Sequence, residues 1–310
     1  MKLLKERVYK AFNETNAVQR YFSKKASRLL EPLGFHVVGD HFYEPIPNIS
    51  HLQESYQDEP RKCLKIDFDF ENAEKVITQS IARWGKDFYY SVQRFGYQES
   101  NYYFRGVDAL YLYCFLRERQ PKSIIEIGQG FSTSVIVAAL EDNYAKTGVK
   151  TRFVSIDPYN RFRFQDGNLL GVELESIATN LQEIPLSFFN QLEEDNLLFV
   201  DSSHVYKFGS DVEYLFEEIY PSLGMGVELH IHDIFSPYHY PLDWYVKERK
   251  FWNEQYYLEN FLRFQDVFQV VMPIYYLTRN SQALQEKCSK ICDYDNFKLT
   301  GSSFYLKKTG

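Results

Sequence analysis

The chain has 310 residues, which is enough to bury a large core and suits one main domain with an extension. Its net charge is −7 at pH 7, and its Lys and Arg residues are scattered among acids, which argues against nucleic acid as the main partner. The first residues lack the uninterrupted apolar stretch of a signal peptide, and no apolar run is long enough to cross a bilayer. The four cysteines favour free or buried thiols. We therefore expect a cytoplasmic protein with no membrane partner.

The N-terminal third predicts an extension rather than a regular domain. Up to about Leu33 the apolar spacing is typical of one or two amphipathic helices. Residues 34–48 alternate like a short hairpin and stop at prolines, whereas residues 55–100 are polar, aromatic and irregular and give no firm prediction. We place the extension at residues 1–105, and its role as a substrate cap or a dimer contact stays open.

A regular alternation of strands and helices follows. Residues Val107 to Gln120 predict an apolar helix that ends at Pro121. Strands are predicted in "SIIEIG", "RFVSID", "NLLFVDSS", "GVELHIHDIF" and "DVFQVVMPI", and helices are predicted after Ser132, Ser210 and Trp252. Such alternation implies a mainly parallel sheet with right-handed crossovers.

Two details concern the ends of these elements. Ser210 and Glu213 form a predicted capping box at the start of a helix that stops at Pro221. No helix of obvious quality separates "DVFQVVMPI" from "GSSFYLKK". A last strand reached in this way can insert antiparallel.

The segment "KSIIEIGQGFSTSVIVAA" combines a strand that ends on an acid, a glycine turn and an apolar helix. In open α/β sheets this turn holds a nucleotide-like ligand. Gly128 and Gly130 let the backbone approach that ligand, and the free N–H groups of the helix start favour an electron-rich or anionic group. The glycines alone do not select the ligand.

The motifs "EIGQGFSTS", "SIDP", "LLFVDSSHVYKFGSDVEYLFEEIYPSL", "GVELHIHDIFSPYHYP" and "WNEQYYLENFL" occur in this order. Together they resemble a class I S-adenosylmethionine-dependent methyltransferase, most closely the bacterial small-molecule and sugar O-methyltransferase-like branch. The resemblance covers residues 106–310, and only "DHFYEPIP" in the N-terminal third is a faint match. It implies an α/β fold with a Rossmann-like, mostly parallel sheet of seven strands whose last strand is antiparallel.

The resemblance also implies the residues that bind S-adenosylmethionine. Around its methionine part and at the following helix start it places Glu126, Gly128, Gln129, Gly130, Phe131, Ser132 and Thr133. Glu126 can accept a hydrogen bond from the cofactor's amino group, and Asp157 can accept two from the ribose hydroxyls. We expect a third strand and its turn in "IATNLQEIP", where Gln182 or Glu183 either bonds the adenine or belongs to a solvated loop.

The predicted catalytic residues lie at the ends of the fourth and fifth strands. Methyl transfer needs a nucleophile held in line with the methyl group and a route for its proton. His204 suits the role of general base, because a neutral imidazole can take a proton near pH 7. Asp233 is the second catalytic candidate, and Asp201 lies beside the cofactor. At least one of His230 and His232, which share one face of a strand, is expected to be structural.

A divalent cation such as Mg²⁺ is the further cofactor that the resemblance implies. Catechol O-methyltransferase-like enzymes have metal-binding aspartates at the positions of Asp201 and Asp233. Their next ligand falls at Ile234, which cannot coordinate, and His232 would be a poor ligand for magnesium. The need for a metal therefore stays open.

The leading interpretation is an enzyme that methylates a hydroxyl group of a small molecule or glycan. A degenerate methyltransferase fold that only binds is one alternative. A dinucleotide-dependent oxidoreductase is another, although Thr133 stands where its third glycine is expected. A homodimer stays open. The aromatic residues after the fifth strand form either a substrate lid or a self-packed loop: Tyr238, His239, Tyr240, Trp244 and Trp252.

Overall fold

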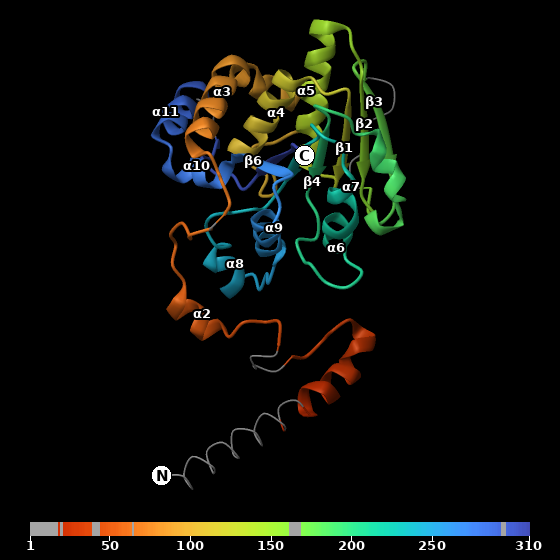
Figure 1. Ribbon diagram of the computed structural model, residues 1–310, viewed down its shortest axis with the longest axis vertical. Coiled ribbons are helices and arrows are strands. Elements are labelled where there is room, and N and C mark those ends of the chain that lie inside the picture. Colours follow the sequence, from red (N-terminus) through yellow and green to blue (C-terminus); the bar gives the residue numbers. More distant parts are fainter. Residues whose placement is uncertain (1–17, 19–20, 39–43, 64, 161–168, 293–295) are drawn as a thin grey trace. The chain divides into compact units, whose positions relative to one another are not determined.

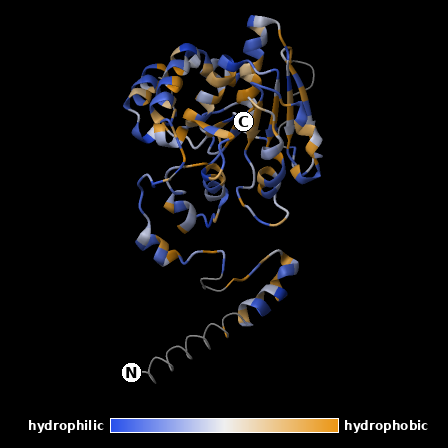
Figure 2. Cartoon of the chain, viewed as in Figure 1, coloured by the Kyte–Doolittle hydropathy of each residue, from blue (hydrophilic) through white to orange (hydrophobic). Residues whose placement is uncertain are grey.

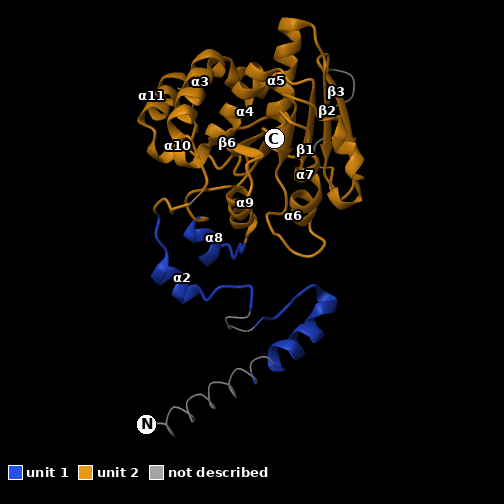
Figure 3. Cartoon of the chain, in the orientation of Figure 1, with its two compact units in different colours: residues 1–58, 241–251 blue, residues 59–240, 252–310 orange. Residues whose placement is uncertain are grey.

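The computed structural model describes residues 18, 21–38, 44–63, 65–160, 169–292 and 296–310. Its contacts divide the chain into two compact units, which Figure 3 colours separately. The first unit comprises residues 1–58 and 241–251, and the second comprises residues 59–240 and 252–310. No helix among the described residues is both long and apolar enough to span a membrane.

The first unit is helical where it is described. Residues 21–30 form a helix that continues into the short 3-10 helix η1 (Glu31–Leu33), in line with the amphipathic pattern. The unit also contains α2 (Ile49–Ser55), which packs on α8 (Leu242–Val246). The described residues of the predicted hairpin contain no strand, and residues 39–43 of it lie outside the described part.

The second unit contains the predicted seven-stranded sheet (Figure 1), with the order β3-β2-β1-β4-β5-β7-β6. Strands β1 to β5 pair in parallel, and β7 is antiparallel to both β5 and β6, so six of the seven strands run in one direction. This confirms the predicted fold class. The strands are β1 (Ser123–Ile127), β2 (Thr151–Ile156), β3 (Val172–Ile177), β4 (Leu197–Val200), β5 (Glu228–Ile231), β6 (Phe268–Pro273) and β7 (Phe304–Lys308).

Helices cover both faces of the sheet, and the apolar strands that they bury stand out in Figure 2. One layer consists of α3 (Phe70–Gln93), α4 (Val107–Arg119), α5 (Phe131–Thr147), α10 (Ile274–Asn280) and α11 (Gln282–Ile291). The other layer consists of α6 (Asp211–Tyr214), a wider π-helical turn (Leu215–Ile219), α7 (Tyr220–Ser222) and α9 (Glu254–Arg263). Alternate residues of each central strand face opposite layers, so Ile124 and Ile125 belong to two different cores.

The structure corrects four predictions about elements. Residues 59–105 belong to the second unit, not to an extension, because α3 packs on α4, α5 and α11. The segment before β7 holds α10 and α11, where no helix was expected.

The third strand, β3, lies before the predicted position, and "IATNLQEIP" is mostly its following turn with the 3-10 helix η2 (Leu181–Glu183). Ser210 caps α6 as predicted, but the carboxylate of Glu213 accepts from the Gly209 N–H instead of the Ser210 N–H.

Candidate functional site

The two glycines of the turn after β1 are required for different reasons. Gly128 has a φ of +86°, and a Cβ there would lie 2.0 Å from the carbonyl oxygen of Asp201. The turn therefore passes against the end of β4, which only glycine permits. Gly130 begins α5 in an extended conformation, and a Cβ there would meet no atom within 4 Å. Its missing side chain leaves open space.

That space is part of a cavity of about 810 Å³ at the carboxyl ends of β1, β2 and β4. The crevice at this edge is where open α/β sheets bind ligands. Eight of the ten predicted cofactor residues line it: Gly128, Gln129, Gly130, Phe131, Ser132, Asp157, Gln182 and Asp201.

Asp157 lies at the β2 end of the cavity with its carboxylate fixed by backbone donors. One oxygen accepts from the Gln129 N–H at 3.1 Å, and the other accepts from the N–H groups of Tyr159 at 2.7 Å and Asn160 at 3.0 Å. A carboxylate offers about four lone-pair sites, so Asp157 can still accept from a ligand hydroxyl. This geometry suits the predicted contact with a ribose.

Glu126 does not line the cavity, contrary to its predicted contact with the cofactor's amino group. It is fully buried and accepts hydrogen bonds from the hydroxyls of Ser132, Thr133 and Ser155 at 2.6–3.0 Å. Burial raises the pKa of Glu126 from 4.5 to about 7, while the three hydroxyls act in the opposite direction. Glu126 thus anchors the first turn of α5 to the sheet. Thr133, also buried outside the cavity lining, accepts from the Gly130 N–H at 3.1 Å.

On the predicted adenine side, Gln182 lies in η2 and reaches the cavity. Its side-chain amide donates to the Gly209 carbonyl at 2.9 Å. Glu183 instead accepts from the side chains of Thr179 and Asn180 and does not line the cavity. Gln182 is therefore the better placed of the two.

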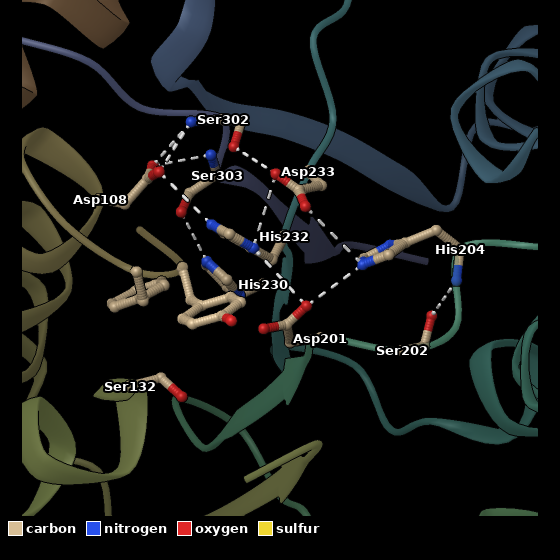
Figure 4. Close-up of polar contacts among 12 residues, drawn as sticks. Asp108, Ser132, Asp201, Ser202, His204, His230, His232, Asp233, Ser302 and Ser303 are labelled. Carbon is tan, nitrogen blue, oxygen red and sulfur yellow. Dashed lines mark hydrogen bonds and ion pairs between the residues drawn. The ribbon is translucent and has the colours of Figure 1, made fainter. Parts of the chain in front are cut away.

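At the other end of the cavity, Asp201 begins a row of ion pairs, drawn in Figure 4. One of its oxygens lies 3.2 Å from His204 Nε2 and 3.6 Å from His232 Nδ1. Asp233 faces the same two histidines at 3.9 and 3.7 Å. Burial alone would raise the pKa of Asp201, but His232 and His204 hold it well below its usual range.

His204 is fixed on all sides. Its Nδ1 lies 2.8 Å from the fully buried carboxylate of Glu254, and its ring packs on Trp252 with centroids 4.2 Å apart. Its backbone has a positive φ of 61°, and its carbonyl accepts from the N–H groups of Asn253 and Glu254. Burial alone would lower the pKa of His204, but the hydrogen bonds to Asp201 and Glu254 raise it from 6.5 to about 10. The two carboxylates therefore favour the charged imidazolium form of the ring.

The two histidines of β5 differ in state. Burial lowers the pKa of His230, whose ring is neutral, stacks on Phe199 at 4.0 Å and bonds Ser303 through Nε2 at 2.8 Å. Burial alone would also lower the pKa of His232, but Asp233, Asp201 and Asp108 outweigh it and raise that pKa. The expectation that one of the pair is structural fits His230.

The predicted metal site is not supported. The described residues include no group of three or more His, Cys, Asp or Glu side chains arranged to hold a metal ion. Asp201 and Asp233 face histidines, and the Oγ of Ser302 donates to Asp233 at 2.8 Å. Ile234, whose side chain cannot coordinate a metal ion, is buried.

Comparisons with known proteins identify the family of the chain. Residues 125–234 match the family model described as a methyltransferase domain. An uncharacterized protein of Archaeoglobus fulgidus is 30% identical over 165 residues, which is 50% of this chain and 73% of that protein. The chain belongs to the class I methyltransferase family.

Two solved structures are similar to this methyltransferase at low identity. The SAH-bound methyltransferase PaMTH1 of Podospora anserina is 12% identical, with 79% of this chain and 98% of that chain covered and a TM-score of 0.34. The apo form of CmcI-N160 is 16% identical, with 64% and 69% covered and a TM-score of 0.37.

Four of the five aromatic residues proposed as a lid belong to the second unit of the methyltransferase, and none of these four lines the cavity. Tyr238 and Tyr240 are buried, His239 bonds the Tyr256 hydroxyl at 3.0 Å, and Trp252 packs on His204. In the first unit, Trp244 lies under the Lys250 ammonium at 4.3 Å. The interpretation as a self-packed loop is favoured.

Four residues of the methyltransferase site escaped sequence reasoning. Tyr103 and Phe104 line the cavity from a loop that follows the segment without a firm prediction, residues 55–100. Asp108 lies within an apolar helix and accepts from the N–H groups of Ser302 and Ser303 at 2.8–3.0 Å. Glu254 follows "WN" at the start of α9. The one signal available in the sequence was that of Asp108, an acid inside an otherwise apolar helix.

Proposed function

We propose that this methyltransferase uses S-adenosylmethionine to methylate a hydroxyl group of a small molecule or glycan. The observation that carries the proposal is one continuous cavity along the edge of β2, β1 and β4. It has Asp157 at one end, the glycine turn in the middle and Asp201 at the other end.

The residues of this cavity fit the cofactor. Gly130 leaves open space beside the helix start, so a ligand can approach the backbone there. Asp157 keeps acceptor capacity for a ribose, and Gln182 lies beyond it toward the predicted adenine position. Glu126 acts indirectly, by holding Ser132 and Thr133 where α5 begins.

The ion pairs of Asp201 with His204 and His232 indicate which group can receive the proton of the hydroxyl. When bound, S-adenosylmethionine supplies a methyl group whose C–S bond breaks, with its electron pair going to sulfur, as the C–O bond forms. Asp201 is the carboxylate at the cavity surface that can accept the hydroxyl's hydrogen bond. Because its low pKa makes it a weak base, it takes the proton late, when formation of the C–O bond has turned the oxygen into a strongly acidic oxonium. His204 does not line the cavity, and both of its ring nitrogens already face carboxylates, those of Asp201 and Glu254. We therefore assign Asp201 the role of base and His204 that of its positioning residue, in place of His204 as the direct base.

Ligand-dependent thermal unfolding tests the cofactor. A ligand that binds the folded state raises the unfolding midpoint by mass action. We expect S-adenosylmethionine and S-adenosylhomocysteine to raise it and NAD and NADP to leave it unchanged. A shift with NAD alone would favour an oxidoreductase. Shifts with the sulfur cofactors, but no methyl transfer to any member of a panel of alcohols and glycans, would favour a binding protein.

A further inference from the structure

We propose that Glu254 is a positioning residue for methyl transfer, which acts by holding the ring of His204 against Asp201. The inference rests on the proposed function, because it takes Asp201 as the group that receives the proton of the acceptor.

Glu254 cannot touch the reacting groups itself. It is the first residue of α9, is fully buried and does not line the cavity. Its carboxylate lies 2.8 Å from Nδ1 of His204, a residue that does not line the cavity either. On the other side of the same ring, Nε2 lies 3.2 Å from Asp201, a contact drawn in Figure 4. One imidazole therefore joins Glu254 to the carboxylate at the cavity wall.

The two carboxylates together define the orientation of the His204 ring. A carboxylate accepts hydrogen bonds and donates none, so a ring nitrogen must carry a hydrogen to bond either of them. The bond that one nitrogen makes decides what the other nitrogen presents to its own partner. Because Glu254 occupies Nδ1, a ring turned about its Cβ–Cγ bond would break the contacts at both of its nitrogens. Glu254 thereby fixes Nε2 as the nitrogen that faces Asp201.

The loop of His204 is also held by the two residues that precede Glu254. The N–H groups of Asn253 and Glu254 donate to the carbonyl of His204. The side chain of Asn253 accepts from the Tyr206 N–H at 2.7 Å and donates to its carbonyl at 3.2 Å. Trp252 packs on the imidazole with centroids 4.2 Å apart. None of these contacts uses the Glu254 carboxylate, so they should keep the loop in place when that carboxylate alone is changed.

The carboxylate and the ring depend on each other. Glu254 lies at the N-terminus of α9, where the helix dipole favours a negative charge. Burial raises the pKa of Glu254, and the hydrogen bond with His204 acts against that rise. Ser202 offers a second route toward the cavity, but its hydroxyl lies 3.4 Å from both Glu254 oxygens. The closer His204 is therefore the partner through which Glu254 acts.

Kinetics of variants of the full chain test this role. Glu254→Gln keeps the shape of the side chain but removes its charge. For an alcohol or glycan that the wild type methylates, we expect kcat to fall about ten- to a hundredfold, the range for one hydrogen bond to a charged group. KM and the dissociation constant of S-adenosylhomocysteine should stay within about twofold. His204→Gln and the double variant should turn over equally slowly, because Glu254 acts only through the ring.

Glu259→Gln is the matched control. Glu259 is a second buried acid of α9, and its partner is Arg61 instead of His204. This variant should lower the unfolding midpoint without lowering kcat. Nitrogen NMR of labelled histidine rings, with the His204 signals assigned from His204→Gln, gives a second readout. The ring shifts of His204 should change in Glu254→Gln and stay unchanged in Glu259→Gln.

Contrary results can be told apart. If Glu259→Gln lowers kcat as much as Glu254→Gln, the loss is only structural and the inference is wrong. If the losses of His204→Gln and Glu254→Gln add in the double variant, or if Glu254→Gln is fully active, Glu254 does not act through the ring. If S-adenosylhomocysteine does not bind, or no alcohol or glycan of the panel is methylated, the proposed function fails instead.

Discussion

The two ends of the cavity are built by different means. At the β2 end, Asp157 and the glycine turn are fixed by backbone hydrogen bonds over short stretches of chain. At the β4 end, Asp201 is fixed by side chains from distant segments, chiefly His204 and His232, which in turn depend on Glu254 and Asp108. The first end therefore presents a carboxylate in a fixed position to a ligand. The second concentrates charge, which is what proton transfer requires.

The largest effect is expected at the turn that joins these ends. Gly128→Ala should destabilise the fold by more than about 2 kcal/mol and abolish cofactor binding, since it combines a positive φ with a clash against the Asp201 carbonyl. Gly130→Ala is the matched variant, because its methyl group enters open space. It should unfold like the wild type in urea while losing affinity for S-adenosylhomocysteine. Equal stability of the two variants would contradict the different roles of the glycines.

A second pair of variants separates binding from chemistry. Asp157→Ala should raise the dissociation constant of the cofactor about tenfold or more and leave turnover at saturation nearly unchanged, because the loss is at the binding end. Asp201→Asn keeps the shape of its residue but removes its charge. It should lower turnover about a hundredfold, within the range for general bases, with little change in cofactor affinity. Isothermal titration and single-turnover kinetics measure the two quantities, and a reversed pattern would exchange the roles of the ends.

The pH dependence of stability should differ between the two ends. His204 has its pKa raised from 6.5 to about 10, so its stabilising contribution is complete below pH 6.5 and is lost as the pH rises toward 10. Glu126, with its pKa raised from 4.5 to about 7, favours the folded state most below pH 4.5 and loses that contribution by pH 7. Urea unfolding across pH should show the upper slope disappear in His204→Gln and the lower slope disappear in Glu126→Gln.

The same contrast explains what the sequence could predict. The glycine turn and Asp157 were found because each lies in a short continuous motif at a strand end. Asp108 and Glu254 were missed because their partners lie far along the chain, and only the strand order brings them together. The helix α3 was missed for a local reason. Its buried positions Ile77, Ile81 and Phe88 keep helical spacing, but polar residues and the mid-helix Gly85 dilute the pattern.

The smallest effect is expected where a histidine of the charged end carries no charge. His230 is neutral, stacks flat on Phe199 and bonds Ser303, so it acts as a packed ring with one hydrogen bond. His230→Phe should cost about 1 kcal/mol of unfolding free energy, because the Ser303 hydroxyl loses its partner while the stacking remains. Turnover should stay within about twofold, in contrast to His232→Phe, which would leave Asp108 and Asp201 without the cation between them. A large loss of turnover in His230→Phe would mean that the catalytic array extends beyond the ion-paired residues.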